Sequence, residues 1–132
     1  MVNYFCIALG GAIGTVGRYW LSEVVARTIG ETFPWGTLII NVSGSFVIGF
    51  FGALTGPDGR IFVGTTARQF VMIGICGGFT TFSSFSQQTL NLMHDGEWLY
   101  AGGNIVGSVA LCLLAVWIGY ALATSLNAMK WV

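Results

Sequence analysis

The chain has 132 residues, of which 55% are hydrophobic and only 8% are charged, with no net charge at pH 7 and a mean hydropathy of +0.78. Soluble domains carry about 25% charged residues, so this composition excludes an ordinary soluble domain and indicates an integral membrane protein. The balance of five basic and five acidic residues argues against a nucleic-acid partner and against binding to an anionic membrane surface.

Four apolar stretches are each long enough to cross a bilayer, which takes about 20 residues. They cover residues 3–21, 35–55, 69–93 and 98–126. The connections between them are short and leave no room for a soluble domain. Residues 1–132 are therefore predicted to form one all-α integral membrane domain of four transmembrane helices surrounded by lipid.

Pairs of small residues, four apart, occur in three of these spans. They are Gly10 with Gly14, Gly103 with Gly107, and the looser pair of Ser45 with Gly49. Such pairs let helix backbones approach closely. Each pair fits packing within one subunit as well as it fits a contact between two subunits, and both interpretations stay open.

Polar residues occur within the first two spans. Arg18 is the only ion placed well inside a span boundary. Asn41 lies deep in the charge-free second span, with Thr37 one turn before it. A single buried asparagine more often joins helices than lines a pore, so Asn41 indicates a pathway only in combination with polar groups from other spans.

The third span contains the most informative stretch, residues 74–89. Two adjacent glycines, Gly77 and Gly78, can release helical backbone at little steric cost. The third helix is therefore predicted to break between Gly77 and Thr80. Backbone carbonyls freed inside a membrane must be buried in protein or line a wet cavity, and they suit a small cation such as Na⁺.

After the predicted break, Phe82 and Phe85 are three residues apart and share a helix face. Hydroxyl and amide side chains surround them: Thr81, Ser83, Ser84, Ser86, Gln87 and Gln88. One interpretation is that the two rings face lipid while the hydroxyls bond back to their own helix. The number of polar groups favours the other interpretation, in which they face a wet or polar neighbour.

The fourth span can supply such a neighbour, because Tyr100, Asn104 and Ser108 follow at intervals of four residues. They form one stripe that rises about 6 Å per step. Together with Asn41 and the third-span hydroxyls, they predict a polar track rich in hydrogen-bond donors and without an acid in its interior. Such a track favours a small anion over a cation or a proton. Four helices fill their own core with side chains, so the conducting unit is expected to be an oligomer.

The basic residues in the short loops give only a weak orientation signal. One side holds Arg60, Arg68 and Lys130, whereas the other holds Arg27, together with Arg18 if that residue reaches the surface. Because Lys and Arg set orientation, so small a margin is compatible with insertion in both directions.

The remaining reactive side chains indicate neither a metal centre nor an enzyme. Cys6, Cys76 and Cys112 are widely separated in apolar runs and are expected to be plain buried thiols. His94, the one histidine, is expected in a solvated loop. No nucleophile, base and orienting group converge at a plausible spacing, so the chain is not predicted to be an enzyme.

Four motifs resemble the Fluc family of bacterial fluoride channels over essentially the whole chain. They are GGFTTFSSFS at residues 77–86, GTVGR at 14–18, PWGTLIIN at 34–41, and Gly107 with Ser108. The resemblance implies an antiparallel homodimer of oppositely inserted subunits in the bacterial cytoplasmic (inner) membrane. It also implies passive fluoride export that relieves fluoride toxicity, through two pathways per dimer.

The resemblance further implies roles for individual residues. A central, structural Na⁺ is expected at the backbone carbonyls of Gly77 and Thr80 from both subunits, and Arg18 is expected near an aqueous vestibule. The expected fluoride pathway comprises Phe82, Phe85, Asn41, Ser108, Asn104, Tyr100, Thr81, Ser84, Gln88 and Thr37. Gln88 departs from the glutamate that the family often carries there, which changes the charge at one end of the track.

Two competing functions remain. A proton-coupled exporter of similar size needs an acid within the membrane, whereas the first acid here is Glu23, at the end of the first span. A non-transporting scaffold would use the polar stripe only to hold helices together.

Overall fold

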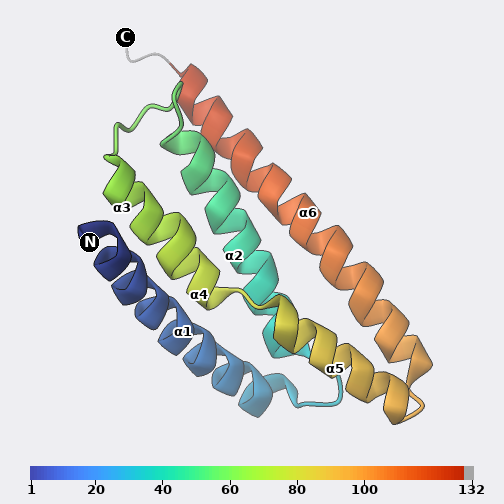
Figure 1. Cartoon of the computed structure of the whole chain (residues 1–132). Helices are drawn as coiled ribbons and strands as arrows, with labels where there is room; N and C mark the ends of the chain where they lie inside the picture. The colour runs from blue at the N-terminus through green and yellow to red at the C-terminus, as the bar shows by residue number, and fades with distance from the viewer. Residues whose placement is uncertain (130–132) are drawn as a thin grey trace.

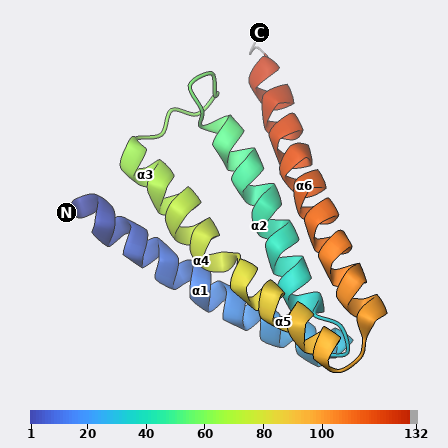
Figure 2. The same cartoon turned by 45° about the vertical axis from the view of Figure 1, so that its right-hand side comes forward.

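The computed structural model describes residues 1–129, which are all-helical and contain no strand. The helices lie side by side along the length of the molecule (Figure 1). The helical segments are α1 (Val2–Ile29), α2 (Trp35–Leu54), α3 (Thr65–Gln69), the π-helix η1 (Phe70–Cys76), α4 (Gly77–Phe79), α5 (Phe82–His94) and α6 (Trp98–Ala128). Segments α3 to α5 together form one interrupted pass, which runs alongside α1 and α2 in the views of Figures 1 and 2. Lys130, one of the basic residues counted for the orientation of the chain, lies outside the described residues.

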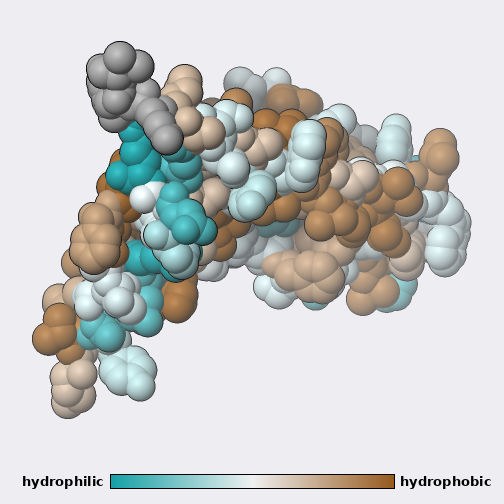
Figure 3. Space-filling view, turned by 90° about the horizontal axis from the view of Figure 1, so that it is seen from above, coloured by the Kyte–Doolittle hydropathy of each residue, from teal (hydrophilic) through white to brown (hydrophobic). Residues whose placement is uncertain are grey.

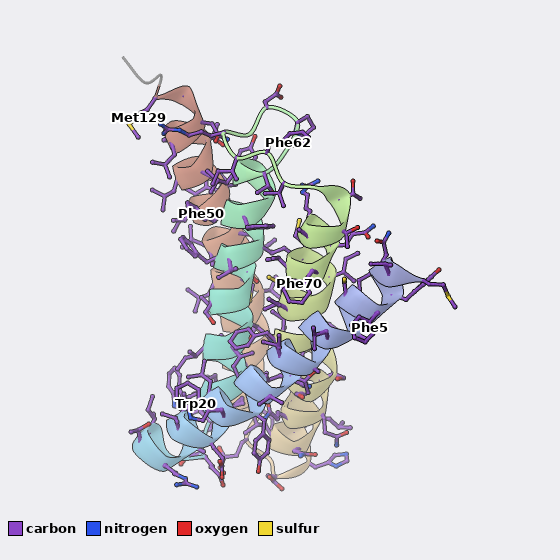
Figure 4. The ribbon with its side chains drawn as sticks, turned by 90° about the vertical axis from the view of Figure 1, so that its left-hand side faces the viewer. Phe5, Trp20, Phe50, Phe62, Phe70 and Met129 are labelled. Carbon is purple, nitrogen blue, oxygen red and sulfur yellow. The ribbon has the colours of Figure 1, made fainter. Side chains whose placement is uncertain are left out.

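Helices α2 and α6 are each long and apolar enough to cross a bilayer. Only 22% and 17% of their most apolar stretches are buried inside the chain, so most of their apolar surface faces outward, unlike the core helix of a soluble protein. Phe5 and Trp20 of α1 are also largely exposed (Figure 4). In the space-filling view, hydrophobic colours predominate along the elongated part of the visible face (Figure 3). These surfaces are suited to contact with lipid.

The contact between α2 and α6 depends on small residues. A side chain at Gly49 of α2 would collide with Val116 of α6, and one at Gly119 would come within 2.9 Å of the Phe50 backbone nitrogen. Glycine lets these two backbones meet directly. Gly49, of the pair with Ser45, therefore serves packing within the chain.

Glycines also allow close backbone contact between α1 and the interrupted pass. A side chain at Gly10 would lie 3.1 Å from the Cα of Gly74, and one at Gly14 would lie 2.8 Å from the Phe79 backbone nitrogen. The Gly10 and Gly14 pair is thus also a contact within one subunit. Gly103 and Gly107 differ, because both have open space where a side chain would stand.

The third pass is interrupted at Thr80 and Thr81 rather than at the double glycine. Gly77 is helical (φ −66°, ψ −37°), whereas Thr80 (φ −81°, ψ 156°) and Thr81 (φ −152°, ψ 113°) are extended. The predicted break in the third pass near Gly77 to Thr80 is confirmed, but the expectation that Gly77 and Gly78 themselves release the helix is wrong. Gly78 has a packing role instead, since a side chain there would lie 3.0 Å from the Cα of Gly11.

Two arginines cap helix ends at one end of the molecule. The Arg68 guanidinium donates to the Gly52 carbonyl at 3.2 Å, near the end of α2, and Arg60 donates to the Leu126 carbonyl at 3.2 Å, near the end of α6. Cations are favoured at helix C-termini, where carbonyl groups have no partner within the helix. Part of the basic charge counted for orientation is therefore used in capping helices.

Candidate functional site

The interruption of the third pass is held open by Asn41 of α2. Its Nδ2 donates to the Thr81 carbonyl at 3.0 Å, and its Oδ1 accepts from the Thr81 N–H at 2.8 Å. One side chain therefore bonds both the N–H and the carbonyl of Thr81, an extended residue whose backbone groups have no partner within a helix. This pairing explains why the break lies at Thr81, since a buried backbone group without a partner costs about 1–3 kcal/mol. Asn41 is thus first a structural partner of the break.

The Asn41 pairing changes the hydrogen bonding of two other carbonyls. In a continuous helix the Thr81 N–H would bond to the Gly77 carbonyl, but here it bonds to Asn41. Likewise, the Ser84 N–H, which would reach the Thr80 carbonyl, donates to Thr81 Oγ1 at 3.2 Å. The carbonyls of Gly77 and Thr80 are therefore among those that the break releases from helical hydrogen bonds.

Thr81 also begins the next helix. Its hydroxyl oxygen accepts from the Ser84 N–H, the usual arrangement at a helix N-cap. The same hydroxyl lies 3.1 Å from the hydroxyls of Ser83 and Ser84. The hydroxyl-rich sequence after the break therefore forms a connected cluster at the start of α5.

Phe82 and Phe85 lie on one face of α5, with ring centroids 5.3 Å apart and ring planes inclined by 46°. Their surroundings differ, because Phe85 is 8% exposed and Phe82 is 75% exposed. An exposed ring one helical turn from a buried one offers its edge to a ligand or to another chain.

Asn104 and Ser108 of α6 are both buried, and Ser108 donates to Asn104 at 3.2 Å. Asn104 in turn donates to the hydroxyl of Thr89 at 2.9 Å. The sequence prediction of the site omitted Thr89. Its place on the same face of α5 as Thr81 and Phe85, at intervals of four residues, was the signal that could have identified it.

A cavity of about 410 Å³ brings many of the predicted residues together between the break, α2 and α6. Its walls include Asn41, Gly77, Thr80, Thr81, Phe82, Phe85 and Ser108. Asn104 is not on the wall and reaches the cavity only through Ser108. The cavity therefore brings together two of the residues whose carbonyls the break releases, both rings and several hydroxyls.

A second hollow, of about 280 Å³, lies on the other side of Thr81. Besides Thr81, it collects four further predicted residues, Arg18, Thr37, Ser84 and Gln88. Thr81 lines both hollows and so lies between them. Gln88 has a buried Oε1 without a hydrogen-bond partner among the described residues.

Tyr100 does not join these residues directly. It is 43% exposed, and its ring lies 6.2 Å from that of Phe33. It lines a third hollow, of about 480 Å³, together with Thr37 and Gln88. The stripe expected along the fourth span therefore divides, with Tyr100 at the end of the molecule and Ser108 at the cavity.

The chemistry of the first two hollows is that of neutral donors and one cation. Neither is lined by a carboxylate or a histidine among residues 1–129, whereas Arg18 lines the second. No group of three His, Cys, Asp or Glu side chains that could hold a metal ion occurs in the part of the chain that the structure describes. These walls suit a small ion held by hydrogen-bond donors.

Long helices with outward apolar faces, and an interrupted hydroxyl-rich pass between them, define a small helical membrane protein with an internal polar site. Residues 5–120 match the family model described as "CrcB-like protein, Camphor Resistance (CrcB)". The chain belongs to this family.

Curated relatives cover nearly the whole chain. They include proteins named "Fluoride-specific ion channel FluC" from Opitutus terrae, 65% identical over 130 residues (98% of each chain), and from Methylocella silvestris, 60% identical over 129 residues (98% of each chain). Another comes from Paramagnetospirillum magneticum, 62% identical over 127 residues, which covers 96% of this chain and 99% of the relative. The resemblance stated from the motifs is confirmed, and the family is one of channels rather than enzymes.

Proposed function

We propose that this protein is a passive, fluoride-selective channel that lets fluoride leave the cytoplasm of a bacterial cell. The observation that carries the proposal is the 65% identity, over 98% of both chains, to a protein named as a fluoride-specific ion channel. Hydrogen fluoride crosses membranes and ionises in a near-neutral cytoplasm, where the anion is trapped. A channel lets the membrane potential drive it out, at about 2.3 kcal/mol per charge for 100 mV.

The two hollows on either side of Thr81 are proposed as parts of the fluoride pathway. Fluoride is small and strongly hydrated, so a pathway has to replace its water with closely spaced donors. The ring edges of Phe82 and Phe85 carry partial positive charge, and the hydroxyl and amide groups supply donors. Arg18 attracts the anion into the second hollow. Tyr100, Gln88 and Thr37 line the third hollow, whose wall also carries the carboxylates of Glu31, Asp95 and Glu97.

The conducting unit is proposed to be a homodimer of four-span subunits inserted in opposite orientations in the cytoplasmic (inner) membrane, with one pathway related to the other by a two-fold axis. Two observations support a partner subunit. Phe82 is 75% exposed although it lines the cavity, and Gly103 and Gly107 have no neighbour where a side chain would stand. A small-residue pair without a contact in its own chain is available to another helix.

A structural Na⁺ is proposed at the centre of that dimer, held by the carbonyls of Gly77 and Thr80 from both subunits. The residues fit such an ion, because the Asn41 and Thr81 bonds leave these two carbonyls without their helical partners. Bound Na⁺ would compensate the partial negative charge of carbonyls that approach one another. If exhaustive replacement of Na⁺ by a large organic cation leaves both dimer and flux unchanged, the sodium proposal is wrong.

The experiment that tests the proposed function is efflux from liposomes that contain the purified protein and are loaded with fluoride or with chloride. After a valinomycin pulse in a potassium gradient, ion-selective electrodes should record rapid release of fluoride and retention of chloride. Release of neither ion would support a scaffold, and equal release of both would overturn fluoride selectivity. Movement driven only by a pH gradient would support a proton-coupled exporter.

A further inference from the structure

A buried chain of three hydrogen bonds joins α6 to α5 beside the cavity. The Ser108 hydroxyl donates to Asn104 Oδ1 at 3.2 Å, and Asn104 Nδ2 donates to Thr89 Oγ1 at 2.9 Å. The Thr89 hydroxyl then donates to the Phe85 carbonyl at 2.7 Å. Exposure is 6% for Ser108, 2% for Asn104 and 6% for Thr89, so bulk water does not compete for these groups.

The direction of these bonds is fixed from the Thr89 end. A hydroxyl has one proton to donate, and Thr89 uses its proton on the Phe85 carbonyl. Thr89 can therefore only accept from Asn104, which turns the amide nitrogen toward Thr89 and the amide oxygen toward Ser108. Ser108 consequently uses its single proton on Asn104 and offers oxygen lone pairs to the cavity it lines.

We propose that Asn104, anchored by Thr89, is a positioning residue that holds the Ser108 proton out of the ion cavity. The proposal rests on the proposed function, since it concerns fluoride in that cavity. An anion beside Ser108 then has to exchange the Ser108–Asn104 bond for its own and gains no additional bond. Weak holding at this point suits conduction, because an ion that binds too tightly does not leave.

The test measures the fluoride concentration that gives half-maximal conductance in planar bilayers. Asn104→Leu removes the acceptor and frees the Ser108 proton, so it should lower this concentration about fivefold, the size of one net hydrogen bond. In a Ser108→Ala background, the further change Asn104→Leu should shift this concentration less than about twofold, because the proton that Asn104→Leu would free is then absent.

Thr89 provides a second pair of variants should Asn104→Leu fail to fold. Thr89→Val removes the group that orients the amide, so Asn104 can turn its nitrogen toward Ser108 and release the Ser108 proton. It should lower the half-maximal concentration as Asn104→Leu does, whereas Thr89→Ser keeps the hydroxyl and should behave as wild type. A residue with a merely structural role would reduce stability without a shift that depends on Ser108.

Two results would overturn the proposal. One is a several-fold rise in the half-maximal concentration for Ser108→Ala alone, which means that Ser108 already donates to fluoride. The other is a lowering by Asn104→Leu that persists in the Ser108→Ala background.

Thermal unfolding of the same proteins separates this proposal from the proposed function. Ser108→Ala and Asn104→Leu remove the same bond, so their effects on stability should be less than additive. If the wild-type protein carries no fluoride current, the proposed function fails. The unfolding measurements then still test the Ser108–Asn104 hydrogen bond, and additive losses of stability would mean that this bond is absent.

Discussion

The α2–α6 pair and the interrupted third pass both contain glycines at close helix contacts, but only the third pass contains a break in the helix. In the pair, glycines at Gly49 and Gly119 bring two uninterrupted helices into backbone contact. In the third pass, Gly74 and Gly78 make the same kind of contact with α1, yet the helix stops at Thr80 and Thr81. The two regions differ because the side-chain amide of Asn41 bonds to the backbone of Thr81 in the third pass. Glycines supply close packing in both regions, whereas only a residue such as Asn41 can satisfy backbone that leaves the helix.

The largest expected effect comes from removing a hydrogen bond between Asn41 of α2 and Thr81 of the third pass. Asn41→Asp keeps an acceptor for the Thr81 N–H but cannot donate to the Thr81 carbonyl. An unpaired buried group costs about 1–3 kcal/mol and a charge at membrane depth about 2.5–3.5 kcal/mol. Fluoride efflux from liposomes should therefore fall at least about 100-fold.

Asn3→Asp is the matched control for that substitution. Asn3 is exposed and accepts from the Thr66 hydroxyl at 2.7 Å, and an aspartate can accept the same bond. Its efflux should equal that of wild type. Full activity of Asn41→Asp would remove Asn41 from both the break and the pathway.

A substitution in the α2–α6 pair should act on stability rather than on selectivity. Gly119→Ala places a methyl group against the backbone of Phe46 and Phe50, and such overpacking costs about 1–3 kcal/mol. Thermal unfolding in detergent should show the loss. Gly102→Ala, in the same helix but with open space around it and outside the Gly103 and Gly107 pair, should leave the unfolding temperature unchanged. Equal losses would mean that the α2–α6 pair does not depend on the Gly119 contact.

Phe82→Ile tests whether the exposed ring of the interrupted pass contributes to fluoride flux. Phe82 is 75% exposed within its own subunit, so its replacement should leave the packing inside that subunit unchanged while it removes a ring from the cavity wall. Fluoride efflux should drop about tenfold, the scale of an aromatic contact of about 0.5–1.5 kcal/mol. Phe62→Ile, in the exposed loop between α2 and α3 (Figure 4), is the control. Unchanged flux for Phe82→Ile would place the ring outside the pathway.

Gln88→Glu should have the smallest effect. It puts a negative charge in the hollow that Arg18 lines, which offsets the attraction of the guanidinium for an anion. Efflux at low salt should decline about two- to threefold, and the difference should shrink at high salt as charges are screened. Gln87→Glu, on an exposed neighbour, is the control. A difference that does not depend on salt would point to a contact rather than to charge.

Composition and spacing were sufficient for the coarse features of this protein. The scarcity of charge predicted helices with outward apolar faces, and the motif at residues 77–86 indicated the family to which the chain belongs. The three-residue spacing of Phe82 and Phe85 predicted that they share a helix face, and their ring centroids lie 5.3 Å apart. These features depend on residues close together in the sequence.

The tertiary structure decided which distant groups complete one another. The double glycine is helical, and the break lies at Thr81 because Asn41, forty residues earlier, bonds both of its backbone groups. Thr89 belongs to the site because Asn104 of another helix donates to it. A hydrogen bond between helices depends on where each backbone lies to within a few tenths of an ångström, and local sequence does not set that position.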